Sequence, residues 1–208
     1  MNKYNPNIHH RRSIRLKGYD YAQAGLYFIT LCCQDRAMLF GNIQNGNLLL
    51  NEYGKIAEEA WLATETIRAN CRLHDYIIMP NHIHGIIEIA ASENNSNTAI
   101  GKFQSPSQTI GAIIRGFKIM TIKKIKDFIL EGGGEFSTGE LQFAPTDKII
   151  QSGESQFAPT DKIIQLDYKI WQRNYYEHII RNEKSYHNIS QYIINNPAKW
   201  SDDKFYLA

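Results

Sequence analysis

The sequence has no long apolar run. Across its 208 residues, no stretch approaches the roughly 18 to 20 consecutive apolar residues that a transmembrane helix needs. Its first twenty residues also lack the apolar centre of a secretion signal. We therefore expect a cytoplasmic protein that does not associate with a membrane.

Cysteine is also scarce. The chain holds three, Cys32, Cys33 and Cys71. Their number is odd and they form no CxxC pair, which argues against a disulfide framework and against a zinc ribbon. We interpret them as small buried side chains.

Acidic residues are missing from two segments that are rich in cations. Residues 1–18 and 115–126 each contain five basic residues and neither Asp nor Glu, although the net charge of the chain is only +2. This asymmetry suits a polyanion such as nucleic acid. It suits a solubilising helix face and a basic tail equally well, and charge alone does not separate the two interpretations.

A ten-residue segment occurs twice. QFAPTDKIIQ spans residues 142–151 and returns letter for letter at 156–165. Two copies are too few for a solenoid, and the glycines and prolines around them favour a long, mobile surface loop. We expect one domain over residues 1–208, with a basic arm at 1–18 and a low-complexity duplicated insertion at about 132–165.

The hydrophobic pattern predicts an α+β fold. Aromatic and β-branched runs predict strands at residues 24–34, 73–79 and 82–90, and a short one at 168–171. Apolar residues at helical spacing predict helices at 51–68, 108–130 and about 182–196. Asn45-Gly46 predicts a hairpin turn. This succession favours a ferredoxin-like antiparallel sheet with helices packed on it.

Two histidines follow the turn in YIIMPNHIHGIIEI. Residues i and i+2 of a strand point to the same face, so His82 and His84 project together. Two adjacent imidazoles can form half of a metal site. The competing interpretation is a pair of solvent-facing histidines beside a turn.

The last predicted helix offers an oxygen ligand and a nucleophile. Tyr192 and Asn196 are four residues apart and therefore lie about 40° apart on one helix face. An Asn oxygen could complete a set with His82 and His84 that suits Mg²⁺ or Mn²⁺. Tyr192 would then lie one helical turn from the metal. With 12 tyrosines in the chain, an ordinary amphipathic-helix tyrosine is the alternative.

Three segments together resemble the REP-associated tyrosine transposases. They are MPNHIHGII, WQRNYYEHIIRNE and YIINNPAKW. The resemblance implies that His82 and His84 are the metal-binding His-hydrophobic-His pair, that Tyr192 is the nucleophile on a C-terminal helix, and that Asn196 is the third ligand. It implies metal-dependent cleavage and rejoining of single-stranded DNA beside REP-like hairpins, through a 5′-phosphotyrosine. Tyr175, Tyr176 and Tyr186 are rival nucleophiles.

The DNA is expected to meet the basic segments. The candidate phosphate contacts are Arg11, Arg12, Arg15, Lys17, Arg115, Lys118, Lys123 and Lys124. Both a monomer and a homodimer that exchanges its tyrosine helix fit the sequence. Two other functions stay open: a non-catalytic, domesticated protein that binds hairpin DNA, and a metal-dependent phosphodiesterase that uses water.

Overall fold

The structure is a computed structural model that describes residues 24–90, 109–133 and 158–206. The predicted basic arm and the first copy of the repeated segment lie outside the described residues. So do four of the candidate DNA contacts, namely Arg11, Arg12, Arg15 and Lys17.

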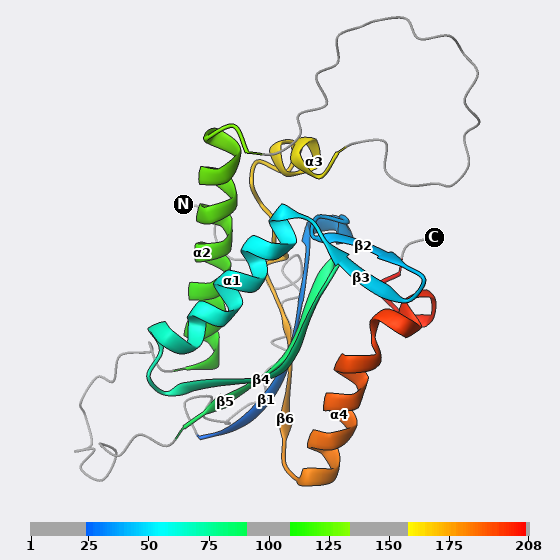
Figure 1. The fold of residues 1–208 in the computed structure, drawn as a ribbon. Helices are drawn as coiled ribbons and strands as arrows, with labels where there is room; N and C mark the ends of the chain where they lie inside the picture. The colour runs from blue at the N-terminus through cyan, green and yellow to red at the C-terminus, as the bar shows by residue number, and fades with distance from the viewer. Residues whose placement is uncertain (1–23, 91–108, 134–157, 207–208) are drawn as a thin grey trace, which may run out of the picture.

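A four-stranded antiparallel sheet forms the centre of the molecule, with the strand order β4-β5-β1-β6 (Figure 1). The strands are β1 (Gly25–Cys32), β4 (Cys71–Met79), β5 (His82–Ile89) and β6 (Tyr176–Ile180). A two-stranded hairpin, β2 (Gly41–Gln44) and β3 (Asn47–Leu50), follows β1. With the helices included, the main elements follow one another as β-α-β-β-α-β, which confirms the predicted α+β fold.

Helices cover both faces of this sheet (Figure 1). Helices α1 (Glu52–Ile67) and α2 (Ile110–Leu130) pack together on one face, and α4 (Glu183–Asn195) lies on the other. Each begins at a side chain that caps it: Asn51 for α1, Thr109 for α2 and Asn182 for α4. No helix within the described ranges combines the length and the apolarity of a membrane span.

Alternation along the strands divides the core in two. Tyr27, Ile29 and Leu31 of β1 are fully buried toward α1 and α2, in the large apolar cluster. Phe28 belongs to a separate small cluster with Ile86, Ile180 and Ile193, under α4. We call these the helix-pair face and the α4 face of the sheet.

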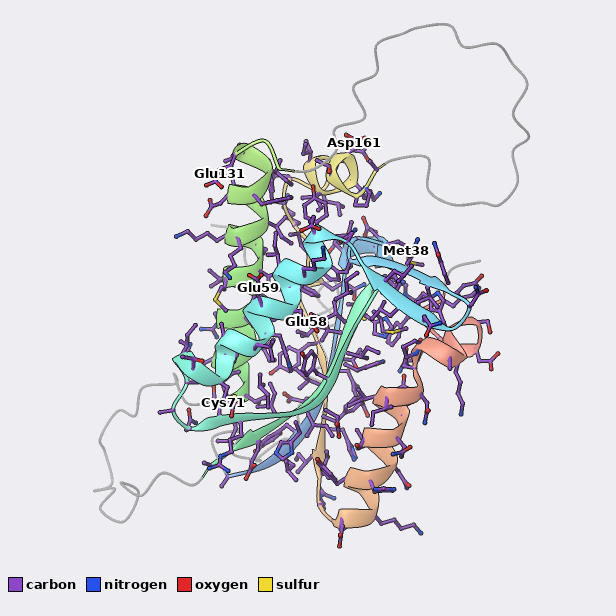
Figure 2. All side chains as sticks on the ribbon, viewed as in Figure 1. Met38, Glu58, Glu59, Cys71, Glu131 and Asp161 are labelled. Atoms are coloured by element: carbon purple, nitrogen blue, oxygen red, sulfur yellow. The ribbon has the colours of Figure 1, made fainter. Side chains whose placement is uncertain are left out.

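A glycine lets α1 approach the helix-pair face. A Cβ atom on Gly85 of β5 would lie 2.5 Å from the Trp61 ring, which is fully buried. The missing side chain makes room for the indole against the sheet. Figure 2 shows how densely side chains fill the space between α1 and the strands behind it.

Two predicted elements differ from the structure. The short strand expected at 168–171 is wrong: Tyr168 has a positive φ in a turn, and only Trp171 forms an isolated bridge, to Cys33. The strand that pairs with β1 at this edge of the sheet is β6, which begins at Tyr176. The aromatic residues at 168–171 pack into the core without forming a ladder, and aromatic content alone does not separate these cases.

The predicted loop over 132–165 is wrong at its end. Pro159–Gln165, in the second copy of the repeat, forms helix α3. Proline suits the first turn of a helix because no hydrogen bond is lost there. Ile163 is fully buried, and the Tyr53 hydroxyl lies 2.5 Å from Thr160 Oγ1. By contrast, the predicted hairpin turn is confirmed, with positive φ at Asn45 and Gly46.

Candidate metal site and its tyrosine

The two histidines of the motif open strand β5 and point to the α4 face. Both are buried, with relative exposures of 0% for His82 and 1% for His84. Their ring centroids lie 4.4 Å apart. The interpretation as a solvent-facing pair is therefore wrong.

Neighbouring side chains orient both imidazole rings. Asn81 Nδ2 donates to the Phe205 carbonyl at 2.8 Å, so its Oδ1 accepts from His82 Nδ1, also at 2.8 Å. His82 Nε2 then carries the lone pair, and this buried atom has no hydrogen-bond partner among the described residues. His84 Nδ1 lies 2.8 Å from Thr30 Oγ1, on the neighbouring strand. An orienting partner on one ring nitrogen, here Asn81 for His82 and Thr30 for His84, is typical of metal-binding histidines.

Burial keeps both histidines neutral, which is the form that binds metal. Burial, and to a smaller extent the nearby Lys204, lower the pKa of His82 to about 3. For His84, burial and the adjacent His82 hold the pKa well below 6.5, while Asp203 acts in the opposite direction. Two adjacent imidazoles would be costly to bury as cations.

Asp203 is the carboxylate of this site. Ligand atoms of His82, His84 and Asp203 all lie within 4.8 Å of one another, so the group could hold a metal ion. Asp203 follows the 3-10 helix η4 (Pro197–Asp202), which turns back toward the start of β5. We did not predict Asp203 from the sequence, because an aspartate in SDDKF has no periodic partner that would mark its position.

Asn196 reaches the same group through Asp203. It is 3% exposed, and its Nδ2 donates to Asp203 Oδ2 at 3.0 Å. Its Oδ1 is buried and has no hydrogen-bond partner within the described ranges. The structure thus places Asn196, the predicted third ligand, beside Asp203 and leaves its Oδ1 atom without a partner among the described residues.

Tyr192 lies against the histidines. Its hydroxyl is 3.0 Å from His84 Nε2, although the two residues are 108 positions apart, and 3.3 Å from Asp203 Oδ2. Burial, and then the carboxylate of Asp203, raise the pKa of this phenol to about 12. The hydroxyl is therefore protonated at neutral pH, and Asp203 lies within reach to accept its proton.

The rival tyrosines make other contacts. The Tyr186 hydroxyl is bonded to His74 Nδ1 at 3.1 Å. The Lys118 ammonium group lies over the Tyr175 ring, 5.8 Å from the ring centre. Tyr176 is on the α4 face and is 47% exposed.

The cations of α2 are not at this site, because α2 packs on the helix-pair face (Figure 1). Arg115 and Lys123 are exposed there, and Lys124 pairs with Glu59 at 3.3 Å. Lys118 donates to the Gln172 carbonyl at 2.7 Å, and burial lowers its pKa to about 8. The cation beside the histidines is Lys204, which no periodic pattern in the sequence marks.

Two solved structures have folds that can be superposed on this one. The structure superposes on a REP-associated tyrosine transposase solved with a bound REP hairpin, with a TM-score of 0.51 and 17% identity, over 93% of this chain and 77% of that one. Superposition on a crystal structure described as a transposase candidate of Deinococcus radiodurans R1 gives a TM-score of 0.43 and 15% identity, over 88% and 97% of the two chains. The fold is thus an α+β fold similar to that of the REP-associated enzyme.

The family follows from sequence. No family model matches the chain. An uncharacterized protein of Haemophilus influenzae Rd is 39% identical over 212 residues, which cover 99% of this chain and 98% of that protein. The chain belongs to the same family as this H. influenzae protein.

Proposed function

We propose that this protein is a metal-dependent single-stranded DNA endonuclease and strand transferase of the tyrosine transposase type. Its substrate is single-stranded DNA next to a hairpin; the structural relative was solved with a bound REP hairpin. Tyr192 is the nucleophile, and His82, His84 and Asn196 hold Mg²⁺ or Mn²⁺, with Asp203 beside them.

The main support for this proposal is the contact between Tyr192 and His84. The Tyr192 hydroxyl lies 3.0 Å from His84 Nε2 and 3.3 Å from Asp203 Oδ2, two residues of the group that could hold a metal. A nucleophile and a candidate metal ligand, brought together from distant parts of the chain, are the geometry that covalent phosphoryl transfer needs. A tyrosine of an ordinary amphipathic helix would not need this contact.

The donor atoms fit a divalent cation. His82 Nε2 and Asn196 Oδ1 are both buried without partners among the described residues, and two imidazoles with oxygen donors suit Mn²⁺ in particular. A cation held there supplies a Lewis acid that polarises the scissile phosphate and favours the phenolate. Thr30 and Asn81 keep the histidine rings in place for this ligand set.

The residues of this chain explain where the proton of Tyr192 goes and which phosphorus–oxygen bonds form and break. Asp203 accepts the proton of the Tyr192 hydroxyl, with which it already shares a 3.3 Å contact. The phenolate oxygen attacks the phosphorus, a tyrosine–phosphate bond forms, and the bond from phosphorus to the 3′ oxygen breaks. That oxygen takes up a proton and leaves as a free 3′ hydroxyl, and the 5′ side stays linked to Tyr192. Attack by another 3′ hydroxyl reverses these steps and rejoins the strand.

The test is covalent capture. Labelled DNA hairpins with randomised single-stranded flanks are incubated with the protein and Mn²⁺, and adducts are sought on denaturing gels. We expect an adduct that needs Mn²⁺, is lost in Tyr192→Phe and His82→Ala, and persists in Tyr186→Phe. Tyr186 is on the same helix but bonds His74 instead of the site, so it is the matched control.

Each alternative gives a different result. Cleavage without an adduct that survives in Tyr192→Phe and fails in His82→Ala would indicate a phosphodiesterase that uses water. Hairpin binding with neither cleavage nor metal dependence would indicate a non-catalytic DNA-binding protein. An adduct of normal yield in Tyr192→Phe would assign the nucleophile to another residue.

A further inference from the structure

A groove runs between β6 and α4, next to the candidate site. It is an open groove with a volume of about 400 Å³. Phe28 forms its floor, Tyr176 and His178 line it from β6, and Ser185 and Asn188 line it from α4. None of these residues belongs to the metal group or is the proposed nucleophile.

Strand register explains why the groove is there. Tyr176 lies opposite Thr30 and His178 opposite Phe28, so both side chains point to the α4 face. Helix α4 packs mainly on β4 and β5, which lie on the other side of β1 from β6. The first residues of β6 are therefore left uncovered, and Tyr176 is 47% exposed.

The groove is continuous with the site through the Phe28 ring. This ring stacks on His84 at 5.4 Å and meets Tyr192 edge-on at 6.2 Å and Tyr176 edge-on at 6.3 Å. Asn188 lines both the groove and a second hollow of about 350 Å³ that includes Tyr192, Asn196 and Asp203. A strand whose phosphate lies at Tyr192 would pass directly into the groove.

The chemistry of the groove fits an unpaired nucleotide. An exposed tyrosine ring offers a stacking face that accepts any base. Lys184 of α4 also lines the groove, and the Lys204 ammonium lies 5.8 Å from the Tyr176 ring centre, so positive charge accompanies the aromatic face. The amides of Asn182 and Asn188 and the Ser185 hydroxyl offer hydrogen bonds to base edges and sugars. An apolar peptide would leave these cations and amides without partners.

We propose that this groove binds one unpaired base of the DNA strand flanking the scissile phosphate, with Tyr176 as its stacking platform. This rests on the proposed function for the identity of the ligand. Tyr176 is here a DNA-binding residue that holds the strand in place, and it takes no part in bond breaking.

Binding measurements test the groove separately from catalysis. The probes are hairpins with a single-stranded flank in which each nucleotide in turn is replaced by an abasic residue, titrated onto the full chain at one fixed salt concentration. We expect one flank position where base loss weakens binding about tenfold, since stacking on an aromatic residue is worth roughly five- to 150-fold in affinity. Placing 2-aminopurine at that position should give a fluorescence that is quenched on binding.

Variants of Tyr176 complete the test. Tyr176→Ala should weaken binding of the intact flank about as much as base loss does, and should become indifferent to the abasic residue. Tyr176→Phe keeps the aromatic face and should behave as the unaltered chain, with thermal unfolding used to confirm that both variants are folded. The groove proposal is overturned if Tyr176→Ala binds the intact flank normally, or if it still loses affinity at the abasic position.

The outcomes separate the two proposals. Covalent adducts that form while no flank position depends on Tyr176 would refute the groove and leave the proposed function standing. A flank position that depends on Tyr176, without any adduct, would support the groove and refute strand transfer.

Discussion

The two faces of the central sheet differ sharply in what they bury. On the helix-pair face, large apolar side chains such as Trp61 and Phe117 fill one continuous cluster. On the α4 face, the apolar cluster contains four buried residues, and beside it lie buried polar side chains such as His82, His84 and Asn196. The comparison indicates that the helix-pair face supplies most of the stability and that the α4 face has buried polar side chains in place of apolar contacts.

The largest expected effect is on the helix-pair face. Trp61→Ala should lower the free energy of unfolding by about 3–5 kcal/mol, because it empties the volume between α1 and Gly85. Ile193→Ala, in the small cluster under α4, should cost about 2 kcal/mol, near the lower end for such a truncation. Urea unfolding followed by circular dichroism measures both. An equal or larger loss for Ile193→Ala would contradict the comparison.

The second expected effect is stabilisation by a metal ion, and it concerns only the α4 face. Mn²⁺ at a hundred times its dissociation constant should stabilise the folded chain by about 2.7 kcal/mol, because the unfolded chain lacks the assembled site. Thermal unfolding with and without the ion measures this gain.

Adjacent residues provide the control for the metal effect. His84→Ala should abolish the gain, whereas Ile83→Val should keep it, since Ile83 is buried toward the helix pair between the two histidines. Loss of the gain in both variants would mean that it reports general stability and not a bound ion.

The third effect is a loss of stability in acid. The unfolded chain protonates His82 near pH 6.5, while the folded chain does so only at about pH 3. The contribution of neutral His82 is therefore complete above pH 6.5 and is lost as the pH falls toward 3, by about 2 kcal/mol at pH 5.

Urea unfolding at pH 7 and pH 5, with metal chelated, measures this loss. His82→Gln cannot titrate at that position and should lose correspondingly less stability between the two pH values. The same loss in both proteins would show that His82 is not the group responsible.

The smallest effect compares two helix caps. The side chains of Asn51 and Asn182 accept from Gly54 N and Ser185 N, at 2.9 and 2.8 Å. Replacing either by alanine should cost about 1 kcal/mol. Asn182→Ala should also reduce adduct formation, because α4 carries Tyr192, whereas Asn51→Ala should leave the adduct yield per folded molecule unchanged. Equal yields in the two variants would indicate that the start of α4 does not position Tyr192.

Periodic patterns in the sequence predicted part of the candidate metal site. Two-residue spacing placed His82 and His84 on one face, and four-residue spacing placed Tyr192 and Asn196 on one side of a helix, because regular backbone fixes those directions. Asp203 lies in an irregular segment, whose path is set by contacts such as that of Asn81 with Phe205. Such contacts leave no period in the sequence.

The same limit explains the errors in the fold. Strand β6 and helix α3 are short, and their places depend on tertiary pairing with β1 and on the pocket around Ile163. The long elements α1, α2, β1 and β5 have enough turns or alternations for the pattern to identify them. The pattern also does not determine which face of the sheet α2 covers, and contact of its cations with DNA stays a prediction.

The register of β1 has a consequence for how the chain can change in length. Thr30 pairs with His84 on one side and with Tyr176 on the other. Deleting one residue from β1 would shift both pairings at once and turn every following side chain to the opposite face. The segment between α2 and β6, in contrast, already contains a duplicated decapeptide. We therefore expect homologues to vary in length between α2 and β6 and to keep β1 free of insertions and deletions.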